Sequence, residues 1–331
     1  MGVSHDAIPV RPQRAHRSGA TVAPWSGPPV AVGTLASPEL LAAAHPQRQH
    51  LVQRILESGL DHVFTADHVS FHNGNGMDGL INAATLCALH PDLKVVVGVY
   101  LLALRHPIAV ARQLATLASN APGQLILGVG IGGEDRNEVA MCGVDPATRG
   151  RRTDECLQIV QALLAGETLD FDGRFYQFER ARIQPQPDVP IPFLIGGRSD
   201  RALARAARYG DGWLASWCSA RRFAEAVAGI DEHCNRAGRA APKRHGLQIW
   251  VGIDEDRALA RERLAKGMQE FYRIPFERFE KYSPYGTPQQ IAEWLADFRD
   301  VGCRLFNLMP IAASEAAGID GIAEVKRLLN A

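Results

Sequence analysis

The fold of this chain can be predicted from the stretch Ile195-Gly-Gly-Arg-Ser-Asp-Arg-Ala-Leu-Ala-Arg-Ala-Ala-Arg-Tyr-Gly-Asp-Gly-Trp213. The apolar run Pro190–Ile195 that leads into it has the length of a strand. Gly196 and Gly197 let the backbone turn tightly. Ser199 is a residue type that begins helices, and the segment after it is rich in Ala, Leu and Arg. The stretch therefore predicts a strand, a turn, a helix and the start of a second strand.

The turn in this unit is also a candidate site for a phosphate group. A glycine-rich turn before a helix points unpaired N–H groups and a partial positive charge outward. Arg198 adds a guanidinium, which binds phosphate through paired N–H donors. An ordinary turn between a strand and a helix has the same glycines, so this candidate depends on the rest of the chain. It comprises Gly196, Gly197, Arg198 and Ser199.

The composition argues against several classes of partner. The chain has 331 residues, of which 46% are hydrophobic and 22% charged, and its formal net charge is zero. Because there is no basic surplus and no block of like charge, we expect neither nucleic acid nor an anionic membrane as a partner. The six cysteines are scattered, with no Cys-x-x-Cys pair and no paired His spacing. This pattern predicts reduced thiols in a cytoplasmic protein without a metal site.

The chain divides into a short extension and one long domain. Residues 1–29 contain several Pro, Arg, Ser and Gly and lack the apolar segment of a signal peptide. We interpret them as a disordered N-terminal extension. No apolar run reaches the length of a membrane span. Residues 30–331 form the predicted domain.

From residue 30 onward, strand and helix signals alternate. Apolar, β-rich runs predict eight strands, at Val30–Thr34, His62–Thr65, Lys94–Val99, Leu125–Val129, Ile191–Ile195, Gly212–Ser216, Leu247–Ile253 and Arg304–Met309. Helical patterns follow them, at Leu40–Ser58, Asp78–His90, Pro107–Ser119, Arg151–Ala165, Asp200–Tyr209, Arg221–Ala237, Arg257–Phe271 with Pro288–Val301, and Gly318–Asn330. This alternation predicts an α/β fold of the (β/α)8 or TIM-barrel type rather than a layered sheet with two domains. The strands read as continuous apolar runs, as expected for parallel strands that are buried on both faces.

Two segments interrupt this alternation, and we expect them to be insertions at the C-terminal face of the barrel. Leu169–Phe178 alternates around Asp172-Gly173, which is a hairpin pattern. Tyr272–Gly286 is aromatic and charged and follows the seventh strand. Since the catalytic face of such a barrel lies where the strands end, we expect the second segment to cover the substrate.

The ends of the second and third strands supply candidate site residues. Asp67 and His68 follow the second strand, where one side chain can face the mouth of the barrel while the other orients it. Two neighbouring polar residues in a loop also commonly satisfy each other. Gly98 in the third strand indicates a bulge or a close approach of the backbone, and a packing requirement explains it equally well.

The loop after the fourth strand is rich in glycine and ends in polar residues. It reads Leu127-Gly-Val-Gly-Ile-Gly-Gly-Glu-Asp-Arg-Asn-Glu138. Its glycines predict tight contact between the backbone and a flat or anionic group. It is not the dinucleotide-binding fingerprint, because no regular helix pattern starts at the third glycine, Gly133. Glu134, Asn137 and Glu138 supply polar groups at the mouth of the barrel, although solvated loop carboxylates look the same in a sequence.

These motifs, in this order, resemble those of the luciferase-like monooxygenase superfamily of flavin- and deazaflavin-dependent oxidoreductases. The resemblance extends from about Val30 to the C-terminus. It rests on Ala66-Asp-His68, Leu104-Arg-His-Pro107, Leu127-Gly-Val-Gly130, Arg149-Gly-Arg-Arg-Thr-Asp-Glu155, Phe171-Asp-Gly-Arg-Phe-Tyr176 and Ile195-Gly-Gly-Arg-Ser199. Each motif alone is weak, whereas the set in register indicates the superfamily.

The resemblance implies a TIM barrel whose C-terminal face binds FMN or coenzyme F420. The ring of the cofactor would lie against the third strand, at a bulge with a non-prolyl cis peptide bond between Gly98 and Val99. The loop that contains Gly130 would hold the ring from the fourth strand. The cofactor phosphate would lie on the turn at Gly196 and Gly197, where the local pattern independently predicts an anion.

The same resemblance favours F420 over FMN. Relatives that use F420 carry Asp-His after the second strand and a glycine-rich fourth loop that ends in Asn-Glu, and this chain has Asp67-His68 and Asn137-Glu138 at those places. It implies that His68 acts near the ring as an acid or base, or stabilises the reduced anion of the ring. It also implies that Asp67 contacts the ring edge and that Asn137 binds the cofactor.

Two departures from the sugar-phosphate dehydrogenases of this group matter. The loop Gly128–Glu138 is one residue longer here, so Glu134 or Gly133 aligns with their catalytic glutamate, and Glu134 is the candidate. His72 stands where those enzymes have a tryptophan. A sugar phosphate is therefore not the expected substrate.

The predicted reaction is hydride transfer between F420 and a small organic substrate, with His68 handling the proton. An FMN-dependent monooxygenase that uses O₂ is the alternative enzyme, and a non-catalytic flavin-binding barrel is the alternative from another class. The resemblance also leaves a homodimer open.

Overall fold

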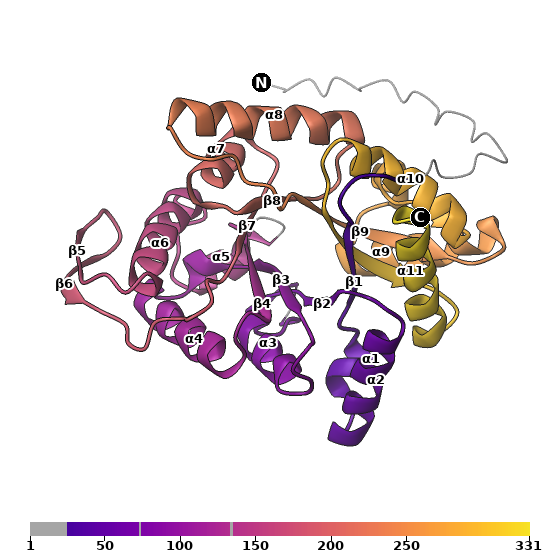
Figure 1. Ribbon diagram of the computed structural model, residues 1–331, viewed down its shortest axis with the longest axis horizontal. Coiled ribbons are helices and arrows are strands. Elements are labelled where there is room, and N and C mark those ends of the chain that lie inside the picture. The colour runs from indigo at the N-terminus through magenta and orange to yellow at the C-terminus, as the bar shows by residue number, and fades with distance from the viewer. Residues whose placement is uncertain (1–24, 73, 133–134) are drawn as a thin grey trace.

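The computed structural model of the chain describes residues 25–72, 74–132 and 135–331. In this part of the chain, eight parallel strands form a closed barrel (Figure 1). The strands are β1 (Ala31–Leu35), β2 (His62–Thr65), β3 (Val95–Tyr100), β4 (Leu125–Val129), β7 (Phe193–Gly196), β8 (Gly212–Ala215), β9 (Gly246–Ile253) and β11 (Leu305–Ile311). They pair in this order, and the pairing of β11 with β1 closes the ring. The predicted (β/α)8 barrel is confirmed.

Helices surround the barrel (Figure 1). They are α1 (Pro38–Ala42), α2 (His45–Glu57), α3 (Gly79–Cys87), α4 (Pro107–Asn120), α5 (Arg136–Met141), α6 (Arg149–Leu164), α7 (Asp200–Tyr209), α8 (Ala220–Arg236), α9 (Arg257–Tyr272), α10 (Pro288–Asp300) and α11 (Glu315–Leu329). The single helix predicted at Leu40–Ser58 is wrong, because this segment forms α1 and α2 with a break at Ala43 and Ala44. Pro46 explains the break, since proline is tolerated in the first turn of a helix but not in its interior.

The apolar residues form an inner and an outer core. The inner cluster contains side chains from strands alone and fills the barrel: Leu35, Phe64, Val96, Val99, Ile126, Leu194, Leu214, Leu305 and Met309. A larger cluster fills the space between the strands and the helices. Each strand therefore buries both faces, which is why the strands read as continuous apolar runs. Full burial of one such side chain stabilises the fold by roughly 1.5–3 kcal/mol, so this double burial is the main source of stability.

Both predicted insertions form ordered structure. β5 (Leu169–Asp172) and β6 (Gln177–Ala181) make an antiparallel hairpin that extends away from the barrel in Figure 1. The segment after α9 contains two short 3₁₀ turns, at Phe276–Arg278 and Glu280–Tyr282, and the strand β10 (Tyr285–Gly286). Because β10 pairs with the last residues of β9, this segment lies at the C-terminal end of the barrel.

Residues 1–24, most of the predicted extension, lie outside the described residues. The N–H of Trp25 donates to the carbonyl of Ala331 at 3.0 Å. The guanidinium of Arg299 lies over the Trp25 ring, 4.5 Å from its centre. The residues before β1 therefore pack against the C-terminal part of the chain. Over the described ranges, every helix is too short or too polar to cross a membrane.

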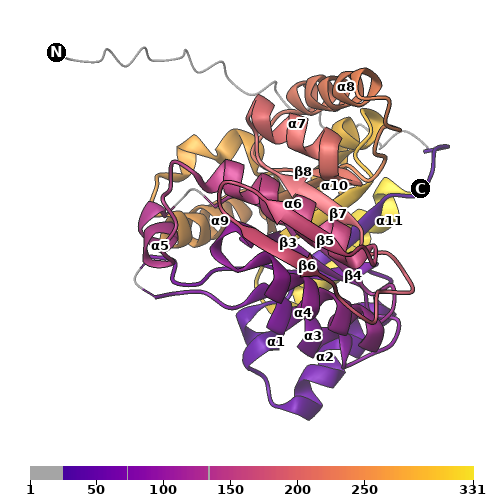
Figure 2. The same ribbon diagram turned by 90° about the vertical axis from the view of Figure 1, so that its left-hand side faces the viewer.

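The two ends of the barrel lie on opposite sides of the molecule. Figure 2 shows α5 on one side and the C-terminus on the other. Since α5 follows β4 and the strands are parallel, all eight strands end on the side of α5. Side chains that follow these strands therefore gather at this end, which is called the rim below.

Candidate active site

The predicted site residues that the structure describes lie at the rim. His68 follows β2, Gly98 lies in β3, Gly130 follows β4 and Gly196 ends β7. These four strands are parallel neighbours, so their C-terminal ends share one side of the rim. The histidine and the glycine turn before α7 are thereby at the same end of the barrel, as hydride chemistry on one bound cofactor requires.

His68 is hydrogen-bonded to a buried glutamate. Its Nδ1 lies 3.0 Å from Oε2 of Glu138. The side chain of Glu138 is 3% exposed, whereas that of His68 is 21% exposed. Because an ionised carboxylate only accepts hydrogen bonds, Nδ1 carries the hydrogen. The other ring nitrogen, Nε2, is then the proton acceptor of the neutral ring.

The loop that contains His68 also holds this glutamate in place. Oε1 of Glu138 accepts hydrogen bonds from the N–H groups of Val69 and Ser70, at 2.7 and 3.1 Å. Backbone donors and the histidine thus bind both oxygens of one carboxylate. This arrangement fixes the ring of His68 relative to the end of β2, which a proton-transfer group needs.

Neither the contact of Glu138 with His68 nor the helix that contains Glu138 was predicted from the sequence. Asp135 caps α5 by accepting the N–H groups of Asn137 and Glu138. The N–H of His72 and these two N–H groups hold the pKa of Asp135 below its ordinary value. A signal was present, since Asp followed three residues later by Glu is typical of a helix N-terminus. With six residues, however, α5 is too short for a period of apolar residues to be visible.

Asp67 is buried and fully bonded within the protein. Its side chain is 0% exposed, and its two oxygens accept hydrogen bonds from both terminal nitrogens of Arg105, each at 2.7 Å. The N–H groups of Gly79 and Leu101 donate to the same carboxylate. Burial raises the pKa of Asp67 above its ordinary value, and the guanidinium opposes the rise. Asp67 therefore joins the loop after β2 to the beginning of α3 and to the segment after β3.

β3 contains the irregularity that the resemblance implied. The register between β3 and β4 shifts between Val97 and Tyr100, and the peptide bond between Gly98 and Val99 is cis. Both the bulge and the cis bond were predicted, and both are confirmed. Val99 packs closely against the next strand, because a Cβ at Gly130 would lie 2.3 Å from its Cγ2. The side chain of Val99 therefore lies directly against the backbone of Gly130 at this part of the rim.

A chain of hydrogen bonds, the interior relay, crosses the barrel and ends on this bulge. Nε2 of His62 lies 2.7 Å from Oδ1 of Asn307. Nδ2 of Asn307 donates to Oε1 of Gln248 at 3.0 Å, and Nε2 of Gln248 donates to the carbonyl of Gly98 at 2.8 Å. Burial lowers the pKa of His62 to about 4, so the ring is neutral at pH 7 and Nε2–H donates. All three bonds therefore point in one direction, toward the rim.

The turn after β7 is open to solvent, as a phosphate site requires. Gly197 has a φ of 114°, which glycine adopts readily. Nε1 of Trp213 donates to the carbonyl of Gly197 at 2.7 Å and fixes the turn from below. Ser199 caps α7, and Gly197, Arg198 and Ser199 are all exposed. The guanidinium of Arg198 lies 5.4 Å from the centre of the Trp217 ring.

Two further site residues, Glu134 and Asn137, are predicted from the sequence. Glu134, the predicted catalytic carboxylate, lies outside the described residues. Asn137 is exposed in the first turn of α5. The carboxylate that the structure brings to His68 is that of Glu138. Within residues 25–72, 74–132 and 135–331, no group of three or more His, Cys, Asp and Glu could hold a metal ion.

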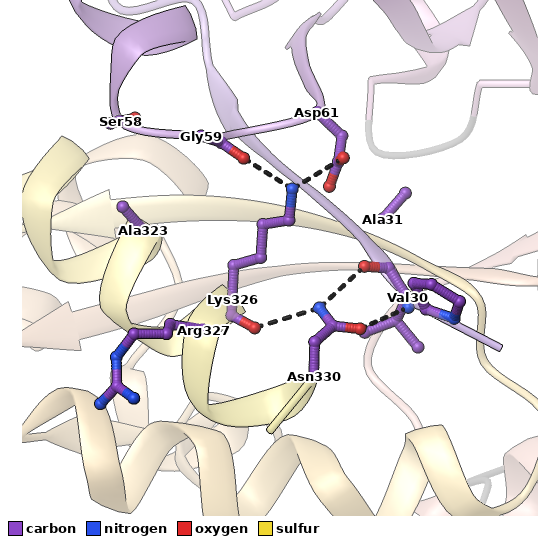
Figure 3. Close-up of a pocket in the computed structure, with 10 residues that line it drawn as sticks. Val30, Ala31, Ser58, Gly59, Asp61, Ala323, Lys326, Arg327 and Asn330 are labelled. Carbon is purple, nitrogen blue, oxygen red and sulfur yellow. Dashed lines mark hydrogen bonds and ion pairs between the residues drawn. The ribbon is translucent and has the colours of Figure 1, made fainter. Parts of the chain in front are cut away.

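The opposite end of the barrel has a pocket whose lining includes several polar groups (Figure 3). It is lined by the beginning of β1, the turn before β2 and the last turns of α11. Nζ of Lys326 donates to the carbonyl of Gly59 at 2.6 Å and to Asp61 at 2.7 Å. The side-chain amide of Asn330 both accepts from and donates to the backbone of Val30. These polar groups are bonded to one another across the pocket.

Comparison with known proteins identifies the family. The sequence profile described as luciferase-like monooxygenase matches residues 32–285. The chain belongs to this family. The resemblance predicted from the motifs is thus confirmed, and the matched range of this luciferase-like protein includes the strands whose ends form the candidate site.

Individual relatives of this luciferase-like protein extend the comparison. An uncharacterized protein of Mycobacterium tuberculosis is 34% identical over 234 residues, which cover 68% of this chain and 80% of the relative. The F420-dependent glucose-6-phosphate dehydrogenase of Beutenbergia cavernae is 35% identical over 165 residues, or 48% of each chain. A solved structure of an F420-dependent secondary alcohol dehydrogenase in complex with an F420-acetone adduct has a TM-score of 0.79 and 20% identity, and covers 91% of this chain and 99% of that one. The last likeness shows a shared fold.

Proposed function

We propose that this protein is an oxidoreductase that transfers a hydride between coenzyme F420 and a small organic substrate. The main support is the hydrogen-bonded pair of His68 and the buried Glu138, which lies at the same rim as the bulge of β3. Oxidation of an alcohol or reduction of a carbonyl moves a proton as well as a hydride, and this pair holds a proton acceptor in a fixed position. The F420-dependent dehydrogenases among the similar proteins support the choice of cofactor.

The residues at the rim fit a flat ring with a phosphate-bearing tail. When bound, the deazaflavin ring of F420 gives or accepts a hydride at its C5. Gly98, Val99 and Gly130 would contact the ring, because Val99 lies against the backbone of Gly130 at the bulge of β3. The turn Gly196-Gly-Arg-Ser199, which is exposed from Gly197 onward, would bind the phosphate through the N–H groups at the start of α7 and the guanidinium of Arg198. Asn137 adds an exposed amide at α5.

His68 handles the proton in this proposal. Since Glu138 binds Nδ1, Nε2 accepts the hydroxyl proton of an alcohol and returns it when a carbonyl is reduced. The carboxylate of Glu138 stabilises the positively charged imidazolium that forms.

Asp67 does not contact the ring in this proposal. The resemblance implies a contact between its carboxylate and the ring edge, but Arg105 and two backbone N–H groups already bind both oxygens. We therefore propose that Asp67 is a positioning residue that holds the loop from which His68 projects. It joins three segments of the rim through one buried carboxylate.

Separate titrations of the purified protein with F420 and with FMN test the cofactor. We expect F420 to bind with a Kd at least about tenfold lower than that of FMN, followed by deazaflavin fluorescence. We also expect F420 to be reduced by an alcohol without O₂. Preferential binding of FMN with O₂ consumption would identify an FMN-dependent monooxygenase instead. Binding without turnover of any alcohol, carbonyl or other substrate would support a non-catalytic barrel.

The variant Gly197→Asp tests the phosphate turn. A Cβ at this position would lie 2.8 Å from the Cβ of Ala202, and the backbone has a φ of 114°. The new carboxylate would also repel a phosphate, so we expect no measurable F420 binding. The matched control is Gly238→Asp, at an exposed glycine that also has a positive φ and open space around it. Tight F420 binding by Gly197→Asp would remove this turn from the site.

We further propose that the protein is a homodimer. Met77 and Ile81, between β2 and the first turn of α3, are 49% and 68% exposed, and Met141 at the end of α5 is 57% exposed. α5 and the loop after β2 adjoin, because Glu138 accepts the N–H of Val69. Exposed apolar side chains of this size on adjoining segments favour an interface with a second copy. Light scattering should give the mass of a dimer for the wild type and of a monomer for Ile81→Asp.

Location and other partners follow from composition. All six cysteines are free, which supports a cytoplasmic protein. A net charge of zero argues against nucleic acid and anionic membranes as partners. Cell fractionation, and binding assays with DNA and anionic vesicles at low salt, test these expectations.

A further inference from the structure

The segment after α9 is fixed to that helix. Arg261 on α9 donates two hydrogen bonds to the carboxylate of Glu280, at 2.7 and 2.9 Å, and the hydroxyl of Tyr285 donates to the same group at 2.9 Å. Phe276 and Phe279 are buried against the inner face of α9. These contacts hold the segment in one position next to the rim.

This segment completes a series of aromatic side chains at the rim, called the aromatic row. Its members come from the loop after β2, the loop after β8, the strand β9, the end of α9 and the segment that follows. Neighbouring ring centres in the row are 4.8–6.1 Å apart, which is the usual distance for aromatic contacts. The row consists of Phe71, Phe271, Trp250, Tyr272, Trp217 and Phe279.

The aromatic row joins the two parts of the proposed site. At one end, the ring of Phe71 stacks on the imidazole of His68, with 4.2 Å between the ring centres. At the other end, Arg198 of the phosphate turn lies over the ring of Trp217. A substrate that gives its proton to His68 therefore has the aromatic row as its neighbour.

The surface of the row is apolar and partly open to solvent. Phe271 is 42% exposed, Ile274 just after it is 37% exposed, and Trp217 and Trp250 are half-buried. Nε1 of Trp250 donates to the hydroxyl of Tyr272 at 3.0 Å, so these two polar atoms are bonded within the row. Phe71, the ring that stacks on His68, is buried, and the exposed part of the row begins at its neighbour Phe271. Large apolar side chains that stay exposed one ring away from the histidine favour an apolar ligand.

We propose that the aromatic row binds the apolar, ring-bearing part of an alcohol substrate, or of the carbonyl compound that corresponds to it. Rings form offset and edge contacts with other rings, which a hydrated sugar phosphate cannot match. The inference rests on the proposed function and names its substrate class. In the oxidation, Nε2 of His68 would take the O–H proton as the C=O bond forms, and the hydride from the broken carbinol C–H bond would be accepted by bound F420.

A series of substrates tests the class. With F420 present, we expect kcat/KM for 1-phenylethanol to exceed that for 2-propanol by about tenfold or more, since one aromatic contact and its buried area are gained. Glucose 6-phosphate should not be oxidised. Equal values for the two alcohols, or a preference for the sugar phosphate, would overturn the inference.

The variant Phe271→Ala tests whether the aromatic row causes the preference for 1-phenylethanol over 2-propanol. We expect the ratio of kcat/KM for 1-phenylethanol over 2-propanol to fall about tenfold, and Phe271→Leu to restore part of it. Val189→Ala is the matched control, because Val189 is an apolar side chain of similar exposure, 43%, outside the row. A second readout needs no turnover: calorimetry of acetophenone with the protein alone should give about tenfold weaker binding for Phe271→Ala.

The outcomes separate the two proposals. Failure of F420 to bind would remove the proposed function and this inference together. Binding of F420 and oxidation of 2-propanol without a preference for a ring would remove this inference alone. A change of mass in light scattering for Phe271→Ala, with the ratio of the two alcohols unchanged, would identify the row as a contact between subunits and would also overturn it.

Discussion

Two histidines at opposite ends of one strand have different environments, and we propose different roles for them. His62 begins β2 and is 2% exposed, whereas His68 follows the same strand at the rim, with its side chain 21% exposed. His62 bonds to an amide, that of Asn307, and His68 bonds to a carboxylate, that of Glu138. The pKa of His62 is lowered by burial to about 4, so that its ring is a fixed donor at pH 7. Only His68 combines a buried anionic partner with access to solvent, which proton exchange needs.

The two ends of the barrel also differ in how far their polar groups are bonded within the chain. At the N-terminal end, Lys326 is bonded to Asp61 and Asn330 to Val30, so the polar groups have partners within the chain (Figure 3). At the rim, Arg198 is exposed at a helix start and Phe271 is 42% exposed. Internal pairing contributes to stability, whereas groups open to solvent can bind ligands. The difference supports our proposal that the chemistry takes place at the rim while the opposite end contributes to stability, as is general for this fold.

The largest expected effect comes from removing the histidine at the rim. His68→Ala should lower kcat by roughly 10²-fold or more, because no other group then takes the proton in a fixed position. The Kd for F420 should stay within a few-fold of the wild-type value, measured by fluorescence titration.

His72→Asn is the matched control for that experiment. His72 is in the same loop, and its Nδ1 lies 3.8 Å from Oδ2 of the neighbouring carboxylate, Asp135. Its backbone has a positive φ of 38°, which asparagine tolerates. We expect its kcat to stay within a few-fold of the wild type. Unchanged turnover in His68→Ala would remove His68 from the mechanism and would break the comparison between the two histidines.

The second effect concerns the buried histidine and the pH dependence of stability. Because burial lowers the pKa of His62 from 6.5 to about 4, the unfolded chain binds a proton between these values that the folded chain does not. The free energy of unfolding is therefore unaffected by His62 above pH 6.5 and falls as the pH drops toward 4. At pH 5 the loss should be about 2 kcal/mol.

Urea unfolding of the wild type and of His62→Gln at pH 7.5 and pH 5 measures this loss. A glutamine keeps an N–H donor for Asn307 but does not titrate, so it should lose about 2 kcal/mol less than the wild type on going to pH 5. Equal losses in the two proteins would mean that His62 is not responsible for the pH dependence.

A third, smaller effect would link the two ends through the interior relay. Gln248→Leu removes the N–H that donates to the carbonyl of Gly98, so the bulge of β3 loses a support inside the barrel. We expect the Kd for F420 to rise about tenfold, with a loss of about 1 kcal/mol in the free energy of unfolding. Gln161→Leu is the control, because the amide of Gln161 donates over the same 2.8 Å to the carbonyl of Tyr209, away from the rim. Equal changes of Kd in both variants would give Gln248 a purely structural role.

The strands and helices of the barrel could be predicted because their local sequence patterns agree with the structure that each segment adopts. β2, β4 and α7 have the predicted bounds, since turn residues flank each of them and their period of apolar residues is clear. The bulge and the cis bond at Gly98–Val99 followed from the resemblance rather than from local signals. The break near Pro46 was missed because the apolar pattern continues across it.

The contacts that define the site could not be predicted from spacing. Glu138 contacts His68 only because α5 folds back on the loop after β2, and no local pattern predicts a contact between residues 70 positions apart in the sequence. Gln248 and Asn307 are single polar residues in apolar strands, where the sequence predicts burial but not a partner. The resemblance implied that Asp67 contacts the cofactor. Its bond to Arg105 could not be predicted, because this bond depends on how the segment after β3 packs. Tertiary packing, rather than local propensity, selects these partners.

The smallest expected effect lies in the pocket at the N-terminal end. The side chains of Lys326 and Asp61 are 24% and 37% exposed, and an ion pair of such exposure contributes about 0.5–1 kcal/mol. Lys326→Met should therefore lower the free energy of unfolding by that amount, measured in urea, and leave kcat/KM unchanged. Arg54→Met, which removes the more exposed pair with Asp320, should cost still less. If Lys326→Met instead lowered kcat/KM more than a few-fold, the N-terminal end would influence the rim, and the separation of stability from chemistry would no longer hold.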